Sequence, residues 1–115
     1  MKHARIRFEG AEHLVQVEAQ NAVRLADGRL LDEDQVEWLP PATGSMFALG
    51  LNYADHAAEL AFKPPTEPLA FIKSPGTYTG HNQTTWRPDN VAYMHYGCEL
   101  VAVIGKPARN VKREN

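Results

Sequence analysis

Apolar and polar positions alternate with a period of two over the first part of the chain, the pattern typical of a β-strand with one buried face. The first two alternating runs cover residues 4–8 and 14–17. The break between them contains Gly10, and glycine readily adopts turn conformations. These runs predict a β-hairpin.

A second pair of short apolar runs follows at residues 22–25 and 29–31. Asp27 and Gly28 lie between them, and an Asp-Gly pair supplies the positive-φ residues of a tight hairpin turn. We therefore predict a second hairpin and assign residues 1–40 to a small N-terminal β-subdomain.

Residues 40–44, Pro-Pro-Ala-Thr-Gly, have the composition of a linker, because proline cannot donate to a strand ladder. Beyond the linker, residues 46–51 are predicted to be a buried strand and residues 69–72 another apolar strand. Residues 55–62 have apolar side chains at helical spacing and are followed by prolines. One or two helical turns are expected there.

The longest strand pattern lies between Val91 and Ile104 and includes a continuous apolar run that begins at Leu100. Such a run is typical of a strand buried on both faces, but only polar sequence follows it. We therefore expect residues 46–115 to be the first half of a larger domain, and the chain to be truncated. The predicted fold class is mainly β with short helices (α+β).

In an extended strand, His95, Gly97 and Glu99 share one face, and Cys98 points to the other, where we expect it to be packed. The run from Glu99 to Lys106 resembles the first metal-binding strand of the fumarylacetoacetate hydrolase superfamily. In that family a Glu-x-Glu pair precedes an apolar run that ends in Ile-Gly-Lys.

The resemblance implies a divalent cation, Mg²⁺ or Mn²⁺, because two carboxylates on one strand face suit a hard ion. Glu99 matches the second ligand, whereas the first position is Gly97, so that one ligand is lost. We expect this chain to bind the cation poorly. His95 is an alternative donor, although imidazole suits Mn²⁺ better than Mg²⁺. Without the resemblance, Glu99 would be assigned as a solvent-facing carboxylate.

A second segment, Asn52 to Glu59, resembles the family's Asn-Tyr-x-x-His-x-x-Glu signature. His56 and Glu59 are three residues apart, which places both on one face of a helical turn, where the carboxylate can orient the imidazole. The resemblance implies that this dyad is catalytic and transfers a proton. Taken alone, such a pair is more often a surface ion pair. Asp55 is expected to cap the turn.

The strand that ends in Phe71-Ile72-Lys73 resembles the family's Phe-x-Lys strand. The resemblance assigns substrate binding to Lys73 and Asn52, since a lysine at a strand end can pair with a carboxylate. An ordinary exposed lysine is the alternative. His81, in the loop beyond, is given no role.

The family implies the N-terminal half of a mixed β-roll or sandwich fold that follows the small β-subdomain. It also implies isomerisation or decarboxylation of a 2-hydroxymuconate-type 2-oxo acid in 4-hydroxyphenylacetate (homoprotocatechuate) catabolism. We expect little activity from this chain alone. The alternatives are an acylpyruvate hydrolase or oxaloacetate decarboxylase of the same superfamily, and a non-catalytic binding or structural fragment.

Charge and composition limit the kinds of binding partner and the cellular location that we expect. A net charge of −2 and scattered basic residues do not predict nucleic-acid binding. The longest apolar run is far shorter than the ~18 residues of a membrane span, and a single cysteine agrees with a reducing compartment, so a cytoplasmic protein is expected. The expected partner is a small dicarboxylate or 2-oxo acid substrate, and the family resemblance implies homo-oligomers.

Overall fold

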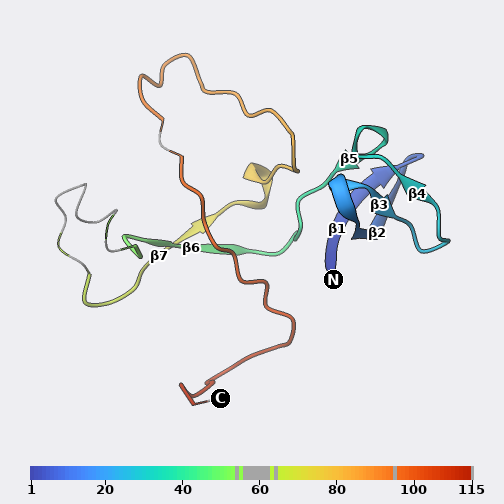
Figure 1. Cartoon of the computed structure of the whole chain (residues 1–115). Helices are drawn as coiled ribbons and strands as arrows, with labels where there is room; N and C mark the ends of the chain where they lie inside the picture. Colours follow the sequence, from blue (N-terminus) through green and yellow to red (C-terminus); the bar gives the residue numbers. More distant parts are fainter. Residues whose placement is uncertain (54, 56–62, 64, 95, 115) are drawn as a thin grey trace. The chain divides into compact units, whose positions relative to one another are not determined.

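The computed structural model comprises 115 residues, and the structure describes all of them except 54, 56–62, 64, 95 and 115 (Figure 1). The described residues contain short strands and three single 3-10 turns, which confirms the mainly β fold class. The chain divides into two compact units, Met1–Thr85 and Trp86–Asn115. The boundary predicted at residues 40–46 stays a prediction.

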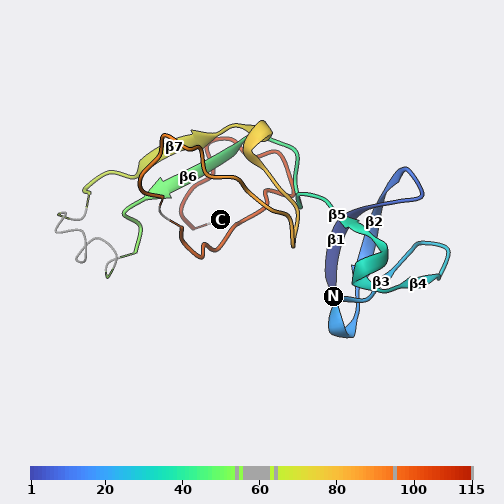
Figure 2. The same cartoon turned by 90° about the horizontal axis from the view of Figure 1, so that it is seen from above.

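The N-terminal strands form a five-stranded antiparallel sheet in the order β4-β3-β2-β1-β5 (Figures 1 and 2). Its longest ladder joins β1 to β2 over seven residue pairs, from Lys2 opposite Val17 to Phe8 opposite Ala11. The remaining strands and turns are short. The elements are β1 (Lys2–Phe8), β2 (Ala11–Val17), η1 (Ala19–Asn21), β3 (Val23–Arg24), β4 (Leu30–Leu31), η2 (Glu33–Gln35) and β5 (Glu37–Trp38).

The turns of both predicted hairpins contain positive-φ residues. Between β1 and β2, Glu9 has φ 49° and Gly10 has φ 79°, as a two-residue I′ turn requires. Between β3 and β4, Gly28 has φ 90°. Both hairpins are confirmed, and in each turn glycine provides a conformation that other residues adopt at a cost.

Asp27 stabilises the second turn through its side chain. Its carboxylate accepts the backbone N–H of Arg29 at 3.0 Å and the Arg29 Nε–H at 2.8 Å. These bonds, the backbone one foremost, hold the pKa of Asp27 below its ordinary value. The group is fully exposed, so the turn relies mainly on its backbone geometry.

The core lies on one face of this sheet. Ile6 is 0% exposed and Val15 is 1% exposed, and they come from neighbouring strands. The strict period of two explains this placement, because alternate side chains of β1 and β2 point to the same face. The core consists of Ile6, Val15, Val23, Leu25, Leu31 and Trp38.

The opposite face carries a network of charges. Glu12 bridges Arg5 at 2.6 Å and Arg7 at 3.5 Å, and Arg7 also pairs with Glu37 at 2.8 Å. Exposed pairs of this kind contribute little stability. Arg5 additionally donates to the carbonyl oxygen of Pro40 at 2.9 Å, which fixes the start of the linker against the sheet.

A separate two-stranded antiparallel sheet contains β6 (Met46–Gly50) and β7 (Leu69–Lys73), which confirms both predicted strands. The burial predicted for residues 46–51 is wrong, because β6 alternates between half-buried and exposed residues, and every residue of the paired β7 is exposed. Among the described residues, no second layer covers this pair of strands. Met46 pairs with Lys73 at one end and Gly50 pairs with Leu69 at the other. A single turn, η3 (Pro75–Thr77), follows β7. The helix predicted at residues 55–62 lies outside the described residues, apart from Asp55.

The loop after η3 contacts the N-terminal sheet at Trp38. The rings of Trp38 and His81 meet edge to face, with centroids 5.4 Å apart and an interplanar angle of 83°. Gly80 lies so close that a Cβ there would overlap the carbonyl oxygen of Trp38. Glycine is therefore required at position 80 for this approach, a constraint that the sequence did not reveal.

Replacing Gly80 by alanine is expected to displace the loop from Trp38, because the added methyl group has no space. Overpacking of this kind costs about 1–3 kcal/mol. The NMR signals of the His81 ring should lose the ring-current shift caused by Trp38. Gly76→Ala is the matched control, since a Cβ there meets only the Ser74 hydroxyl at 3.9 Å. Equal shifts in both variants would contradict this packing.

In the second unit, residues 86–94 and 96–114 contain no strand, so the strand predicted between Val91 and Ile104 is wrong for the described residues. A strand needs hydrogen-bonding partners, and here the apolar run has no ladder to join. Leu100 is 91% exposed and Ile104 is 78% exposed. Cys98 is exposed as well, which corrects its predicted packing. None of the helical segments in the described residues has the length and hydropathy of a bilayer-spanning helix.

Candidate functional site

The predicted site residues fall into three segments. The first begins where β6 ends, at Leu51, whose φ of 54° is unusual for a non-glycine residue. This turn directs the chain into Asn52, which is exposed. The dyad residues His56 and Glu59 lie outside the described residues, so their catalytic role stays a prediction.

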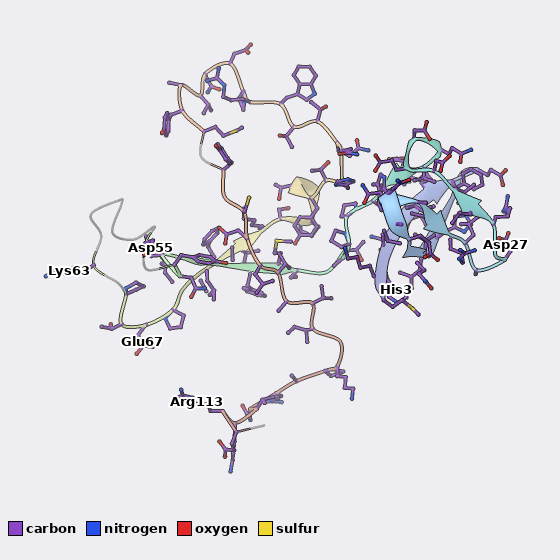
Figure 3. The ribbon with its side chains drawn as sticks, in the orientation of Figure 1. His3, Asp27, Asp55, Lys63, Glu67 and Arg113 are labelled. Atoms are coloured by element: carbon purple, nitrogen blue, oxygen red, sulfur yellow. The ribbon has the colours of Figure 1, made fainter. Side chains whose placement is uncertain are left out.

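A shallow hollow of about 360 Å³ lies at this end of the β6–β7 sheet. Residues 49–52 and 65–69 line it, and its polar side chains are those of Asn52, Thr66 and Glu67. Asp55, Lys63 and Glu67 are described positions in the connection between β6 and β7, and all three are exposed (Figure 3). The hollow is open to solvent, and of the predicted site residues that the structure describes, Asn52 lies in its lining.

Lys73 lies at the other end of the same sheet, opposite Met46. Its side chain is exposed and shares a face with those of Phe71 and Leu69. Four residue steps separate Lys73 from Leu69, which is about 13 Å along a strand. The structure therefore places Asn52 and Lys73 at opposite ends of the ladder and does not bring them together.

The third segment surrounds Glu99. The Glu99 carboxylate lies next to residue 97: a Cβ added to Gly97 would be 3.1 Å from the Glu99 Oε1. Both residues are exposed, and His95 lies outside the described residues. Among the described residues, no group of three or more His, Cys, Asp or Glu side chains is arranged to hold a metal ion. Glu99 thus contributes one carboxylate next to a position that contributes none.

All three segments lie within the part of the chain that matches one protein family. The family model described as fumarylacetoacetate (FAA) hydrolase C-terminal matches residues 45–115, so the chain belongs to the fumarylacetoacetate hydrolase family. The match leaves residues 1–44, including the five-stranded sheet, outside the family domain.

More specific similarities lie within the family. The chain is 69% identical over 74 residues to the 4-hydroxyphenylacetate degradation bifunctional isomerase/decarboxylase of Salmonella dublin, and 68% identical over 73 residues to the homoprotocatechuate catabolism bifunctional isomerase/decarboxylase of Escherichia coli. Each match covers 64% of this chain and 17% of the relative. A 2,4-didehydro-3-deoxy-L-rhamnonate hydrolase from a Sphingomonas species is 38% identical over 71 residues, which is 62% of this chain and 25% of that protein.

Sequence reasoning overlooked Tyr78, whose hydroxyl lies 3.0 Å from the carbonyl oxygen of Gly44 and 3.1 Å from that of Lys73. No motif marks this residue. The available signal was its position five residues after a lysine at a strand end, just beyond a Ser-Pro-Gly turn that can reverse the chain direction.

Proposed function

We propose that this chain carries part of the catalytic apparatus of an isomerase/decarboxylase that acts on 2-hydroxymuconate-type 2-oxo acids in 4-hydroxyphenylacetate (homoprotocatechuate) catabolism. The observation that carries the proposal is the identity of 68–69% to two proteins named as bifunctional isomerase/decarboxylases of 4-hydroxyphenylacetate degradation and homoprotocatechuate catabolism. The chain spans 17% of the length of these relatives, so it would supply only some of the residues that act on the substrate.

In this proposal, the His56–Glu59 dyad transfers the proton. A carboxylate three residues from an imidazole on a helical turn can orient the ring and raise its basicity. Lys73 would pair with one carboxylate of the dicarboxylate substrate, since its ammonium group is exposed at a strand end. The role predicted for Asn52 stays a prediction, because Asn52 lies beyond the other end of the ladder and the structure does not bring it to Lys73.

The described residues do not fit the Mg²⁺ or Mn²⁺ that the family resemblance implies. Glycine stands at position 97, where the family's first carboxylate ligand is expected, so Glu99 has no partner carboxylate there, and the described part of the chain has no three-ligand cluster. We therefore propose that this chain alone binds the cation weakly and has little or no activity. The lone cysteine favours a reducing compartment such as the cytoplasm.

A transplant tests the proposed activity. Residues 45–115 would replace the matching stretch of the Escherichia coli isomerase/decarboxylase, with and without Gly97→Glu. The Gly97→Glu chimera is expected to consume 5-carboxymethyl-2-hydroxymuconate, measured by substrate depletion. Adding His56→Gln should reduce its rate by about 10²- to 10⁴-fold, the usual contribution of a general acid or base.

The same assay separates the alternatives. A folded Gly97→Glu chimera that consumes oxaloacetate or an acylpyruvate, but not the muconate, would favour the decarboxylase or hydrolase of the same superfamily. A folded chimera that consumes none of the three would favour a non-catalytic binding or structural role for the segment. Circular dichroism of each chimera provides the control for folding.

A further inference from the structure

Tyr78 follows the single turn η3, which directs the chain back toward the end of β7. The turn is held by two backbone bonds, from the Thr77 N–H to the Ser74 carbonyl at 2.9 Å and from the Tyr78 N–H to the Pro75 carbonyl at 3.1 Å. The Tyr78 side chain is half-buried. Its ring position is therefore fixed by local backbone structure and partial packing.

The Tyr78 hydroxyl lies against two carbonyl oxygens from different segments. The oxygen of Gly44 is 3.0 Å away, and that of Lys73 is 3.1 Å away. A phenol has one O–H, so the two carbonyls share a single proton. Gly44 comes just before β6 and Lys73 is the last residue of β7, and the hydroxyl thus bridges the two strands where their ladder ends.

The end of a two-stranded ladder is its least stable part, because the last pair has neighbours on one side only. Met46 and Lys73 form that last pair. We propose that Tyr78 is a positioning residue. It holds the Lys73 backbone in register with Met46 and thereby determines the position of the Lys73 ammonium group. This inference rests on the proposed contact between Lys73 and a substrate carboxylate.

The test measures binding of 2-oxoglutarate to the whole chain by NMR, through the side-chain signals of isotope-labelled Lys73. Tyr78→Phe keeps the ring and removes the hydroxyl. We expect it to weaken binding by about threefold to tenfold, the range that one hydrogen bond supplies. Thr77→Val is the matched control, because it removes a hydroxyl that donates to the Ser74 carbonyl in the same turn. It should change the affinity less than twofold.

Lys73→Met separates the inference from the proposed function. If Lys73→Met leaves binding unchanged, Lys73 is not the contact, and both ideas are overturned. If Lys73→Met abolishes binding while Tyr78→Phe behaves like Thr77→Val, the substrate contact stands and the positioning role is overturned.

Amide hydrogen exchange gives a readout without ligand. Tyr78→Phe should speed exchange at the Met46–Lys73 end of the ladder and leave the Gly50–Leu69 end unchanged. Faster exchange at both ends would mean that Tyr78 supports the sheet as a whole, which would overturn the positioning role.

Discussion

Replacing Gly97 by glutamate is expected to strengthen Mn²⁺ binding by about tenfold to a hundredfold, because affinity for a hard cation depends on the number of charged oxygen ligands. The new side chain would start 3.1 Å from the Glu99 Oε1, so both carboxylates can reach one ion. The Glu99 side chain is exposed and can shift by the few tenths of an ångström that the added Cβ requires. Calorimetric titration of Mn²⁺ and Mg²⁺ measures the change.

Two controls separate the charge from the shape of the new side chain. Gly97→Gln has nearly the same size without the charge and should leave binding close to that of the unaltered chain. Adding Glu99→Gln to Gly97→Glu should cancel the gain, because a single carboxylate remains. Tight Mg²⁺ binding by the unaltered protein would falsify the assignment of Gly97 as a lost ligand.

Truncating Ile6 to alanine is expected to unfold the five-stranded sheet. Ile6 is fully buried in β1, and such a truncation costs about 2–5 kcal/mol. A sheet whose core consists of only six side chains has a stability of the same order. Urea denaturation followed by Trp38 fluorescence should therefore lose its cooperative transition. Trp86→Phe as the background removes the signal of a second tryptophan that is 88% exposed.

Leu14→Ala is the matched control for Ile6→Ala. Leu14 lies in the neighbouring strand, opposite Arg5, on the face away from the core, and is 71% exposed. Its truncation should change the free energy of unfolding by no more than about 0.5 kcal/mol. If both truncations shift the transition equally, the face assignment of the sheet is wrong.

The two hairpins could be predicted because the residues that determine them are neighbours in the sequence. Alternation along β1 and β2 sets which face is buried, and the Asp27-Gly28 pair fixes a turn. The strand β5, which completes the sheet beside β1, was not predicted. Two residues carry too little periodicity to signal a strand, and their pairing with Ile6 and Arg7 depends on a contact distant in sequence.

The apolar run after Glu99 was predicted to be a strand, and the structure shows none there. Its composition indicates a preference for burial, but a strand also requires a neighbouring chain segment to complete its hydrogen bonds. Sequence patterns do not contain that partner. For the same reason the approach of Gly80 to Trp38 and the bridge made by Tyr78 became visible only in the folded chain.

The sequence singled out candidate site residues by their type, but it did not predict how they are arranged. The sequence placed Asn52 just after one predicted strand and Lys73 at the end of another, yet only the antiparallel pairing shows that they lie at opposite ends of one ladder. The roles given to His56, Glu59 and Glu99 remain predictions that the chimera and the metal titration can test.

The exposed thiol of Cys98 has a practical consequence for these measurements. It sits between Gly97 and Glu99, so air oxidation would tether two copies at the very residues under study. Metal titrations accordingly need reduced samples, kept so with a phosphine rather than a chelating dithiol. The same thiol also offers a unique anchor for a spin label, through which the distance to a bound paramagnetic ion could be read.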